Sequence, residues 1–378
     1  MRIAFHTPLN LFDDGGVSGD RRMARQLVAA LETLGHVVEP VRAARGYLSS
    51  ADSARLEGHR TDAARLRDQL LAGYRSGTPC PDLWFTYHNY YRAPDLLGPA
   101  IAAALDIPYV TAEASDSERR AFDEWSAHTA IVRDSLAAGD VHFHFTDRDR
   151  QGLEPWRRPG TALLELAPFI TFAKEPPRRE EHAGPPRLIT IAMMREGTKQ
   201  NSYLTLARIL ARIPDAGWRL SIVGDGRQRH AIERAFACLP QDRIDWLGLI
   251  PRERALDELA RHDVFVWPGV REAYGLVYLE AQAVGLPVVA FDSGGVSATV
   301  TAGKTALLAP EGDEAAFAEN LVTLLQDKAR RERMGAEARA FVLEERTSAR
   351  AAARLAEGLE LACRHRRDKL RAAGRAAS

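Results

Sequence analysis

The stretch from Pro268 to Gly295 constrains the fold of this 378-residue chain more than any other. An apolar run at 264–267 leads into it and predicts a buried strand. Gly275 then opens a segment with helical spacing, and a second apolar run at 288–291 predicts another buried strand. This order of strand, loop, helix and strand is typical of an α/β fold.

The same stretch carries two carboxylates, Glu272 in the loop and Glu280 in the helix. Because Gly275 has no Cβ, it lets a ligand approach the helix start, where the amides of Leu276 and Val277 are free to bind an anion. Carboxylates accept hydrogen bonds from sugar hydroxyls. We interpret the stretch as a site for a sugar nucleotide, with a solvated helix face as the alternative for Glu280.

Strands and helices alternate along most of the chain, which predicts parallel sheets covered on both faces. One segment rich in proline and charge interrupts the alternation and predicts a linker between two halves of similar size. The predicted division is an N-terminal domain over 1–172, a linker over 173–187, a second domain over 188–357 and a final helix over 358–378.

In the first half, apolar spacing predicts one long helix at 117–138. The loops that follow the predicted strands should meet at one rim of the sheet. His88 lies in such a loop, within the sequence Tyr-His-Asn-Tyr-Tyr-Arg, and these side chains suit a sugar acceptor. Gly19 precedes the first long helix, where it could admit a phosphate or simply flank an N-cap.

Two basic residues, Arg195 and Lys199, follow the first strand of the second half. They are candidates to neutralise a departing nucleoside diphosphate, with surface solvation as the alternative. Gly224 lies in the sequence Val-Gly-Asp-Gly after a strand, but Arg229 stands where a dinucleotide fingerprint needs its third glycine. A tight turn is therefore the simpler interpretation of Gly224.

Composition excludes several classes of protein. The 51 basic and 51 acidic residues balance, which gives no indication of nucleic-acid binding. The three cysteines are far apart and form no metal or disulfide pattern, so we expect a cytoplasmic protein. The N-terminus predicts a short strand rather than a signal peptide, and no apolar run predicts a membrane span. The basic segment 364–371 fits a solvated helix end or peripheral contact with anionic lipid at the inner face of a membrane.

The motif in the central stretch resembles the signature of the retaining family-four glycosyltransferases. In that family two glutamates eight positions apart precede the pattern A-x-A-x-G-x-P-V-V, and here Glu272 and Glu280 precede Ala281-Gln282-Ala283-Val284-Gly285-Leu286-Pro287-Val288-Val289. The segments 223–226 and 246–248 fall where the family has its V-G-x-G and L-G motifs.

This resemblance implies a GT-B fold, with two facing Rossmann-like domains and a last helix that crosses back to the first domain. It implies transfer of a hexose, with retained configuration, from a UDP- or GDP-linked sugar to a hydroxyl acceptor. That acceptor would be a sugar, a lipid-linked sugar or another small molecule. No metal ion or other cofactor is expected, because amides and basic residues take the place of a metal.

By resemblance, Glu272 should contact the donor sugar, while Arg195 and Lys199 neutralise the diphosphate. The other donor-binding residues would be Gly19, Gly224, Leu249, Ala273, Tyr274, Gly275, Leu276, Val277 and Glu280. The chain departs from the family by one residue in the spacing of Arg195, and it has Glu113 where many members have histidine. The acceptor-side catalytic partner is therefore either His88 or Glu113. A GT-B epimerase and a catalytically silent nucleotide-binding module are the alternative functions.

Overall fold

The computed structural model describes residues 1–13, 15 and 18–376. The chain divides into two compact units. Unit 1 comprises Met1–Ala167 and Ser348–Ser378, and unit 2 comprises Pro168–Thr347. The divisions fall after residues 167 and 347, where the sequence had suggested 172 and 357.

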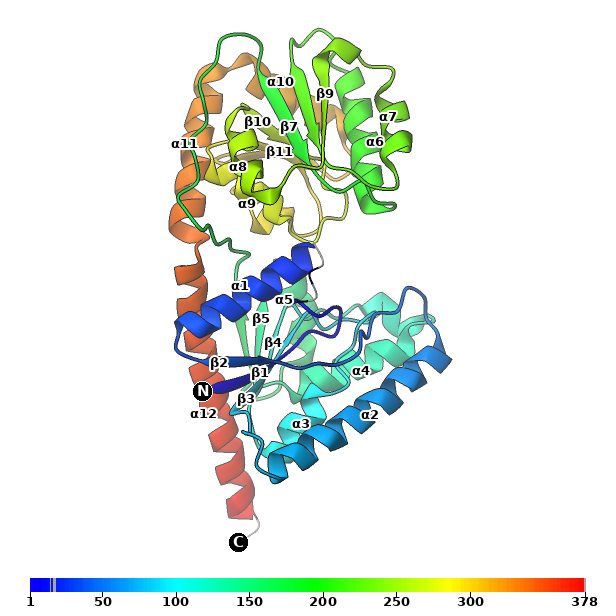
Figure 1. The fold of residues 1–378 in the computed structure, drawn as a ribbon, viewed down its shortest axis with the longest axis vertical. Helices are drawn as coiled ribbons and strands as arrows, with labels where there is room; N and C mark the ends of the chain where they lie inside the picture. Colours follow the sequence, from blue (N-terminus) through cyan, green and yellow to red (C-terminus); the bar gives the residue numbers. More distant parts are fainter. Residues whose placement is uncertain (14, 16–17, 377–378) are drawn as a thin grey trace. The chain divides into compact units, whose positions relative to one another are not determined.

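Unit 1 contains a parallel sheet. Its strands are β1 (Arg2–His6), β2 (Val37–Pro40), β3 (Leu83–Tyr87), β4 (Tyr109–Ala112), β5 (Val141–His144) and β6 (Ala162–Glu165). They pair in the order β2-β1-β3-β4-β5-β6. Figure 1 labels β1 to β5. The helices of the unit are α1 (Gly19–Thr33), α2 (Ser53–Arg75), α3 (Gly98–Leu105), α4 (Ser126–Ala138), α5 (Asp147–Leu153) and α12 (Ser348–Ala376).

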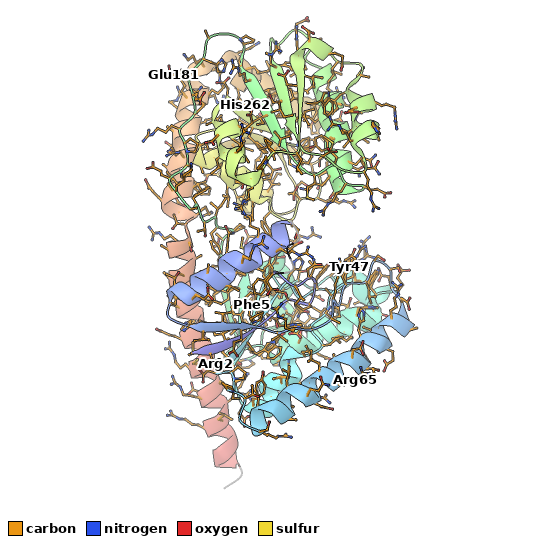
Figure 2. All side chains as sticks on the ribbon, in the orientation of Figure 1. Arg2, Phe5, Tyr47, Arg65, Glu181 and His262 are labelled. Atoms are coloured by element: carbon orange, nitrogen blue, oxygen red, sulfur yellow. The ribbon has the colours of Figure 1, made fainter. Side chains whose placement is uncertain are left out.

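Aromatic side chains fill the centre of unit 1. Figure 2 labels Phe5 on β1. Its ring stacks on Phe85 of β3 with centroids 5.3 Å apart, and the Phe85 ring centre lies 6.4 Å from that of Phe143 on β5. Every residue of β3 and β5 is buried, which is expected where helices cover both faces of a parallel sheet. The core therefore fixes the positions at which these strands end.

Unit 2 repeats this arrangement. Its strands are β7 (Arg187–Ile191), β8 (Arg219–Val223), β9 (Ile244–Gly248), β10 (Val264–Val266), β11 (Val288–Asp292) and β12 (Ala306–Pro310), in the parallel order β12-β11-β10-β7-β8-β9. Its helices are α6 (Thr198–Ala211), α7 (Arg229–Phe236), α8 (Arg252–Ala260), α9 (Leu276–Ala283), α10 (Glu314–Gln326) and α11 (Lys328–Glu345). The predicted α/β class with parallel sheets is confirmed.

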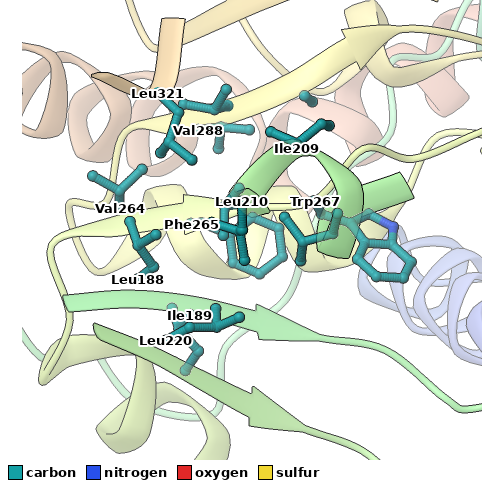
Figure 3. Packing of buried hydrophobic residues seen from close by; sticks show 14 of the residues in the cluster. Leu188, Ile189, Ile209, Leu210, Leu220, Val264, Phe265, Trp267, Val288 and Leu321 are labelled. Carbon is teal, nitrogen blue, oxygen red and sulfur yellow. The ribbon is translucent and has the colours of Figure 1, made fainter. Parts of the chain in front are cut away.

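The core of unit 2 lies between its sheet and its helices. In Figure 3, Ile189 of β7, Phe265 of β10 and Val288 of β11 pack together with Leu210 of α6. All four side chains are fully buried. Because β7 and β10 are neighbours at the centre of this sheet, the loops that follow them are held at the same edge.

One local prediction was wrong, and two elements were not predicted. The helix predicted at 117–138 is broken, since residues 123–125 separate a 3₁₀ turn at Glu118–Phe122 from α4. The carboxylate of Asp123 accepts a hydrogen bond from the backbone of Trp125 at 2.8 Å, which competes with a continuing helix. Helix α5 and strand β12 were not predicted at all.

The segment predicted as a linker, 173–187, has no helix or strand before Arg187. It is nevertheless bonded to its own unit. Arg339 of α11 donates to the carbonyl oxygens of Pro176 and Pro177, and the amide of Arg179 donates to Val284 at 2.8 Å. The segment is therefore packed along unit 2.

Helix α12 packs on unit 1, against α1 and β5 (Figure 1). Lys369 forms an ion pair with the buried carboxylate of Asp140 at 2.9 Å, and the Nδ1 of His365 lies 2.9 Å from the same carboxylate. Arg366 pairs with Asp106 at 3.1 Å. Part of the charge in the basic segment 364–371 is thus neutralised within unit 1. In the described part of the chain, no helix is both long and apolar enough to cross a membrane.

Candidate functional site

The predicted donor residues gather at the carboxyl edge of the sheet in unit 2. The side chains of Lys199 and Glu272 form an ion pair, although 73 residues separate them in the sequence. Lys199 lies in the first turn of α6, which follows β7, and Glu272 lies in the loop that follows β10. The pairing of β7 with β10 brings the two loops together.

Trp267 completes this group, and the sequence analysis had given it no role. Its indole Nε1 donates to the carboxylate of Glu272 at 3.4 Å. The ammonium of Lys199 lies 5.7 Å from the centre of the same ring. The Glu272 side chain is 14% exposed and that of Lys199 is 30% exposed, so both charges stay accessible while the ring restricts their positions. The sequence did contain a signal for this role, because Trp267 stands at the end of a predicted buried strand, next to the loop that carries Glu272.

The start of α9 has the geometry expected of an anion-binding helix end. Gly275 has φ 76°, and a Cβ placed on it would lie 2.6 Å from the ring of Tyr278. Among the described residues, no side chain caps this helix. The amide of Tyr278 donates to Gly275, which leaves Leu276 and Val277 at the helix end as predicted.

The remaining donor-site candidates of unit 2 lie on its loops and, for Glu280, on α9. Arg195 is exposed and forms no ion pair in the described part of the chain, so the structure does not bring it to Glu272. Ala273 is exposed, Tyr274 is buried, and Glu280 is half-buried on α9. Leu249, another of the predicted donor-binding residues, is 78% exposed after β9.

Gly224 has a structural reason to be glycine. Its φ is 143°, and a Cβ there would lie 1.9 Å from the carbonyl oxygen of Ala192. The loop after β8 therefore packs directly on the loop after β7. The close approach of the two loops explains the glycine, and residues 224–226 are not in a turn as the sequence had suggested. The donor-binding role of Gly224 stays a prediction.

Unit 1 carries a second group of polar side chains at the carboxyl edge of its own sheet. His88 follows β3 and Glu113 follows β4, and the two strands pair so that Tyr87 lies opposite Ala112. Both residues have a positive φ, 64° for His88 and 52° for Glu113, which is unfavourable for residues other than glycine. Asp20, in the first turn of α1, lies 3.5 Å from the Nδ1 of His88.

These groups change each other's pKa. Burial alone would lower the pKa of His88, but the charges of Glu113, Asp20 and Asp149 and a hydrogen bond to Asp20 raise it to about 9. Burial raises the pKa of Glu113 to about 7, against the effect of His88 and a hydrogen bond from Tyr87. At neutral pH His88 is therefore an imidazolium, and Glu113 exchanges its proton readily.

Asp149 is the member of this group that the sequence analysis missed. Its carboxylate accepts a hydrogen bond from Thr146 at 2.8 Å, at the start of α5. Burial raises its pKa. The signal was present in the Thr-x-x-Asp sequence directly after a buried strand, which is a helix-capping pattern. Gly19 begins α1 beside Asp20, with Ser18 as the N-cap.

The structure therefore places His88 and Glu113 together, and Lys199 and Glu272 together, each pair within one unit. Among the residues that the structure describes, no group of three or more histidine, cysteine, aspartate or glutamate side chains could hold a metal ion.

Solved structures with the same fold identify its class. Sucrose-phosphate synthase from Thermosynechococcus elongatus superposes with a TM-score of 0.70 at 18% identity, over 94% of this chain and 97% of that one. Anabaena HepE in complex with UDP superposes with a TM-score of 0.68 at 15% identity, over 95% of this chain and 100% of that one. The two Rossmann-like units thus define a GT-B fold, and the predicted fold is confirmed.

Sequence comparison finds a match between part of the chain and one family model. Residues 185–327 match the family model described as Glycosyl transferases group 1. This region contains the Glu272–Glu280 motif, and the resemblance predicted from that motif is confirmed.

Two relatives illustrate the match. The first is the GDP-mannose-dependent monoacylated alpha-(1-6)-phosphatidylinositol monomannoside mannosyltransferase of Corynebacterium glutamicum, 38% identical over 36% of this chain and 37% of the relative. The second is the D-inositol 3-phosphate glycosyltransferase of Nocardia farcinica, 37% identical over 52% of this chain and 44% of the relative. The chain spans less than half the length of each.

Proposed function

We propose that the chain is a retaining glycosyltransferase, which moves a hexose from a nucleoside-diphosphate sugar to a hydroxyl acceptor without a metal ion. The observation that carries the proposal is the ion pair of Lys199 with Glu272, close to the start of α9. A cation beside unpaired helix amides suits a diphosphate, and a carboxylate beside both suits the hydroxyls of the attached sugar.

The helix start and Lys199 are both needed to stabilise the diphosphate. A helix start contributes only about 0.3–1 kcal/mol towards an anion at the surface, and up to about 2 kcal/mol when partly buried. A leaving diphosphate needs more stabilisation than this, and Lys199 supplies a full charge. Arg195 is exposed and precedes Lys199 by four residues in the sequence. It would add a second positive charge when a ligand binds.

In the proposed reaction, the bond between the sugar C1 and the diphosphate oxygen breaks while the acceptor oxygen forms a new bond to C1. The acceptor hydroxyl gives up its proton to the departing diphosphate, so that atoms and charge balance. Glu272 would hold the sugar hydroxyls, and Glu280 would accept from the ribose. The acceptor would bind to unit 1, where either His88 or Glu113 would contact it.

The donor is proposed to carry UDP or GDP. One relative is named as GDP-mannose-dependent, and Anabaena HepE has been solved with UDP-glucose. A cytoplasmic location stays part of the proposal, with the exposed remainder of the basic segment 364–371 as the element for any contact with a membrane surface.

The variants Lys199→Ala and Glu272→Ala test the proposal. Each should lower the release of nucleoside diphosphate from UDP-glucose or GDP-mannose by about 10²–10³-fold, the loss typical of removing one aligned stabilising group. Lys304→Ala is the matched control, because Lys304 is exposed and precedes β12, at the opposite edge of the sheet.

Wild-type turnover in both variants would contradict the proposal. Tight nucleotide binding without turnover on any acceptor would favour the silent binding module. Conversion of the donor sugar to an epimer, without transfer, would favour the epimerase.

A further inference from the structure

A row of alternating arginine and aromatic side chains lies on unit 1, outside the groups described above. Its members are Arg45, Tyr47, Arg92, Tyr91 and Arg120, and we call it the arginine–tyrosine row. The Arg45 guanidinium lies 4.8 Å from the Tyr47 ring centre, and Arg92 donates to the Tyr47 hydroxyl at 3.1 Å. Arg92 and Arg120 lie 5.8 and 5.1 Å from the Tyr91 ring centre.

The row is at the same edge of the sheet as His88. Its residues come from the loops after β2, β3 and β4, and parallel strands all end at one edge. Tyr90 connects the two groups, since its ring lies 4.7 Å from His88 and 5.6 Å from Tyr91. A ligand that reached His88 would therefore lie beside the row.

Among the described residues, only one of the three arginines of the row has a carboxylate partner. Arg120 pairs with Asp123 at 2.8 Å, but neither Arg45 nor Arg92 has a carboxylate within ion-pair distance among the described residues. The Nε of Arg92 is buried and has no hydrogen-bond acceptor in the described part of the chain. A partly buried guanidinium with an unused donor is costly unless an anion binds it.

Stacking prepares this guanidinium for a ligand. Arg92 also lies 5.5 Å from the ring centre of Trp125, which is buried. Rings on its flanks hold the planar fork in one orientation, and a guanidinium held in this way suits the oxygens of a phosphate or carboxylate. The half-exposed Tyr90 and Tyr91 offer aromatic surface to the ring of a sugar.

We propose that the acceptor is an anionic saccharide, whose phosphate or carboxylate binds Arg92 and Arg45 in the arginine–tyrosine row. The inference rests on the proposed function in taking unit 1 as the acceptor side. It deepens that function by naming the chemical class of the acceptor. Phosphate and carboxylate share the required geometry, so the test separates them.

The experiment titrates the full-length chain with glucose 6-phosphate, glucuronate and glucose, and measures affinity by calorimetry at low ionic strength. At least one anionic sugar should bind about tenfold or more tightly than glucose, as expected for one hydrogen bond between charged groups. The advantage should disappear in Arg92→Gln, and it should weaken as salt is added.

Two control variants locate the effect. Arg65→Gln removes an arginine of α2 that is 66% exposed and already paired with Asp62, and it should keep the advantage; Figure 2 labels Arg65 on α2 and Tyr47 of the row. Lys199→Ala removes the proposed diphosphate partner in unit 2 and should also keep it. If Arg92→Gln unfolds the chain, Arg45→Gln tests the same row from its exposed end.

Equal affinity for the three sugars would overturn the inference, as would an advantage that survives both Arg92→Gln and Arg45→Gln. Loss of the advantage in Lys199→Ala alone would place the anion in unit 2 and overturn it as well. These outcomes leave the proposed function standing if donor turnover still depends on Lys199 and Glu272. Failure of donor turnover with the advantage intact would overturn only the glycosyl transfer.

Discussion

His88 holds its proton at neutral pH because three carboxylates, Asp20, Glu113 and Asp149, act on it. Its pKa of about 9 lies above that of a free histidine, so the folded state binds this proton more tightly than the unfolded state. The stabilisation is complete below about pH 6.5 and is lost as the pH rises through about 9.

The direction of this pH dependence can be tested by substituting His88 alone. Urea unfolding of the wild type should show stability falling between pH 6.5 and 9, and His88→Gln should flatten that part of the profile. The pKa of Glu113 is also raised, from 4.5 to about 7. The stability linked to its proton is therefore lost over a lower pH range than that of His88, as the pH rises from about 4.5 to 7. Identical profiles for the wild type and His88→Gln between pH 6.5 and 9 would show that His88 is not held as an imidazolium.

Some residues of the candidate sites could be predicted from the sequence, and others could not. Glu272 and Lys199 were both chosen from the sequence, each from its place after a buried strand. Trp267, which contacts both, was not chosen, because a buried aromatic residue is ordinarily part of the core. Asp149 was missed for a similar reason, since its capping role hid its proximity to His88.

Helix α9 depends on the conformation of the residue before it. Gly275 and Gly303 both have positive φ, 76° and 75°, but only Gly275 lacks room for a Cβ. Gly303→Ala should therefore cost only the backbone strain, about 1–2 kcal/mol. Gly275→Ala should cost clearly more, because the new methyl group would meet the Tyr278 ring at 2.6 Å.

Urea unfolding of the two alanine variants measures this difference directly. Because the φ values match, the extra loss in Gly275→Ala reports the contact with Tyr278. Equal losses would mean that the ring moves aside freely, and that α9 does not need glycine for packing.

The element order was largely predictable, because buried parallel strands are apolar throughout and alternate with amphipathic helices. The exceptions follow from local chemistry. Asp123 accepts from the backbone two residues on and so breaks a helix that apolar spacing favoured. Strand β12 pairs only with β11, at the edge of its sheet, and had no flanking pattern strong enough to predict it.

Across the whole molecule, unit 2 is one continuous stretch, whereas unit 1 is completed by the last helix of the chain. Leu355 and Leu359 of α12 are fully or almost fully buried in unit 1. Ending the chain after Thr347 should therefore destabilise unit 1 by roughly 3–6 kcal/mol for these two side chains alone. Unit 2 should be little affected.

Hydrogen exchange of the shortened chain checks this expectation. Amides of β1 to β6 should lose protection, while those of β7 to β12 should keep it. As a control, Arg354→Ala in the full-length chain removes a partly exposed residue of α12 and should leave both units protected. Equal loss of protection in both units would show that they unfold as one.

The sequence by itself determined the α/β class, the two-unit organisation and the donor motif, because these depend on periodicity and on residue types at fixed spacing. The tertiary structure decided which of those residues meet. The ion pair of Lys199 with Glu272 depends on the pairing of β7 with β10, and the environment of His88 depends on the pairing of β3 with β4. Strand order is a property of the folded core, and no local spacing in the sequence encodes it.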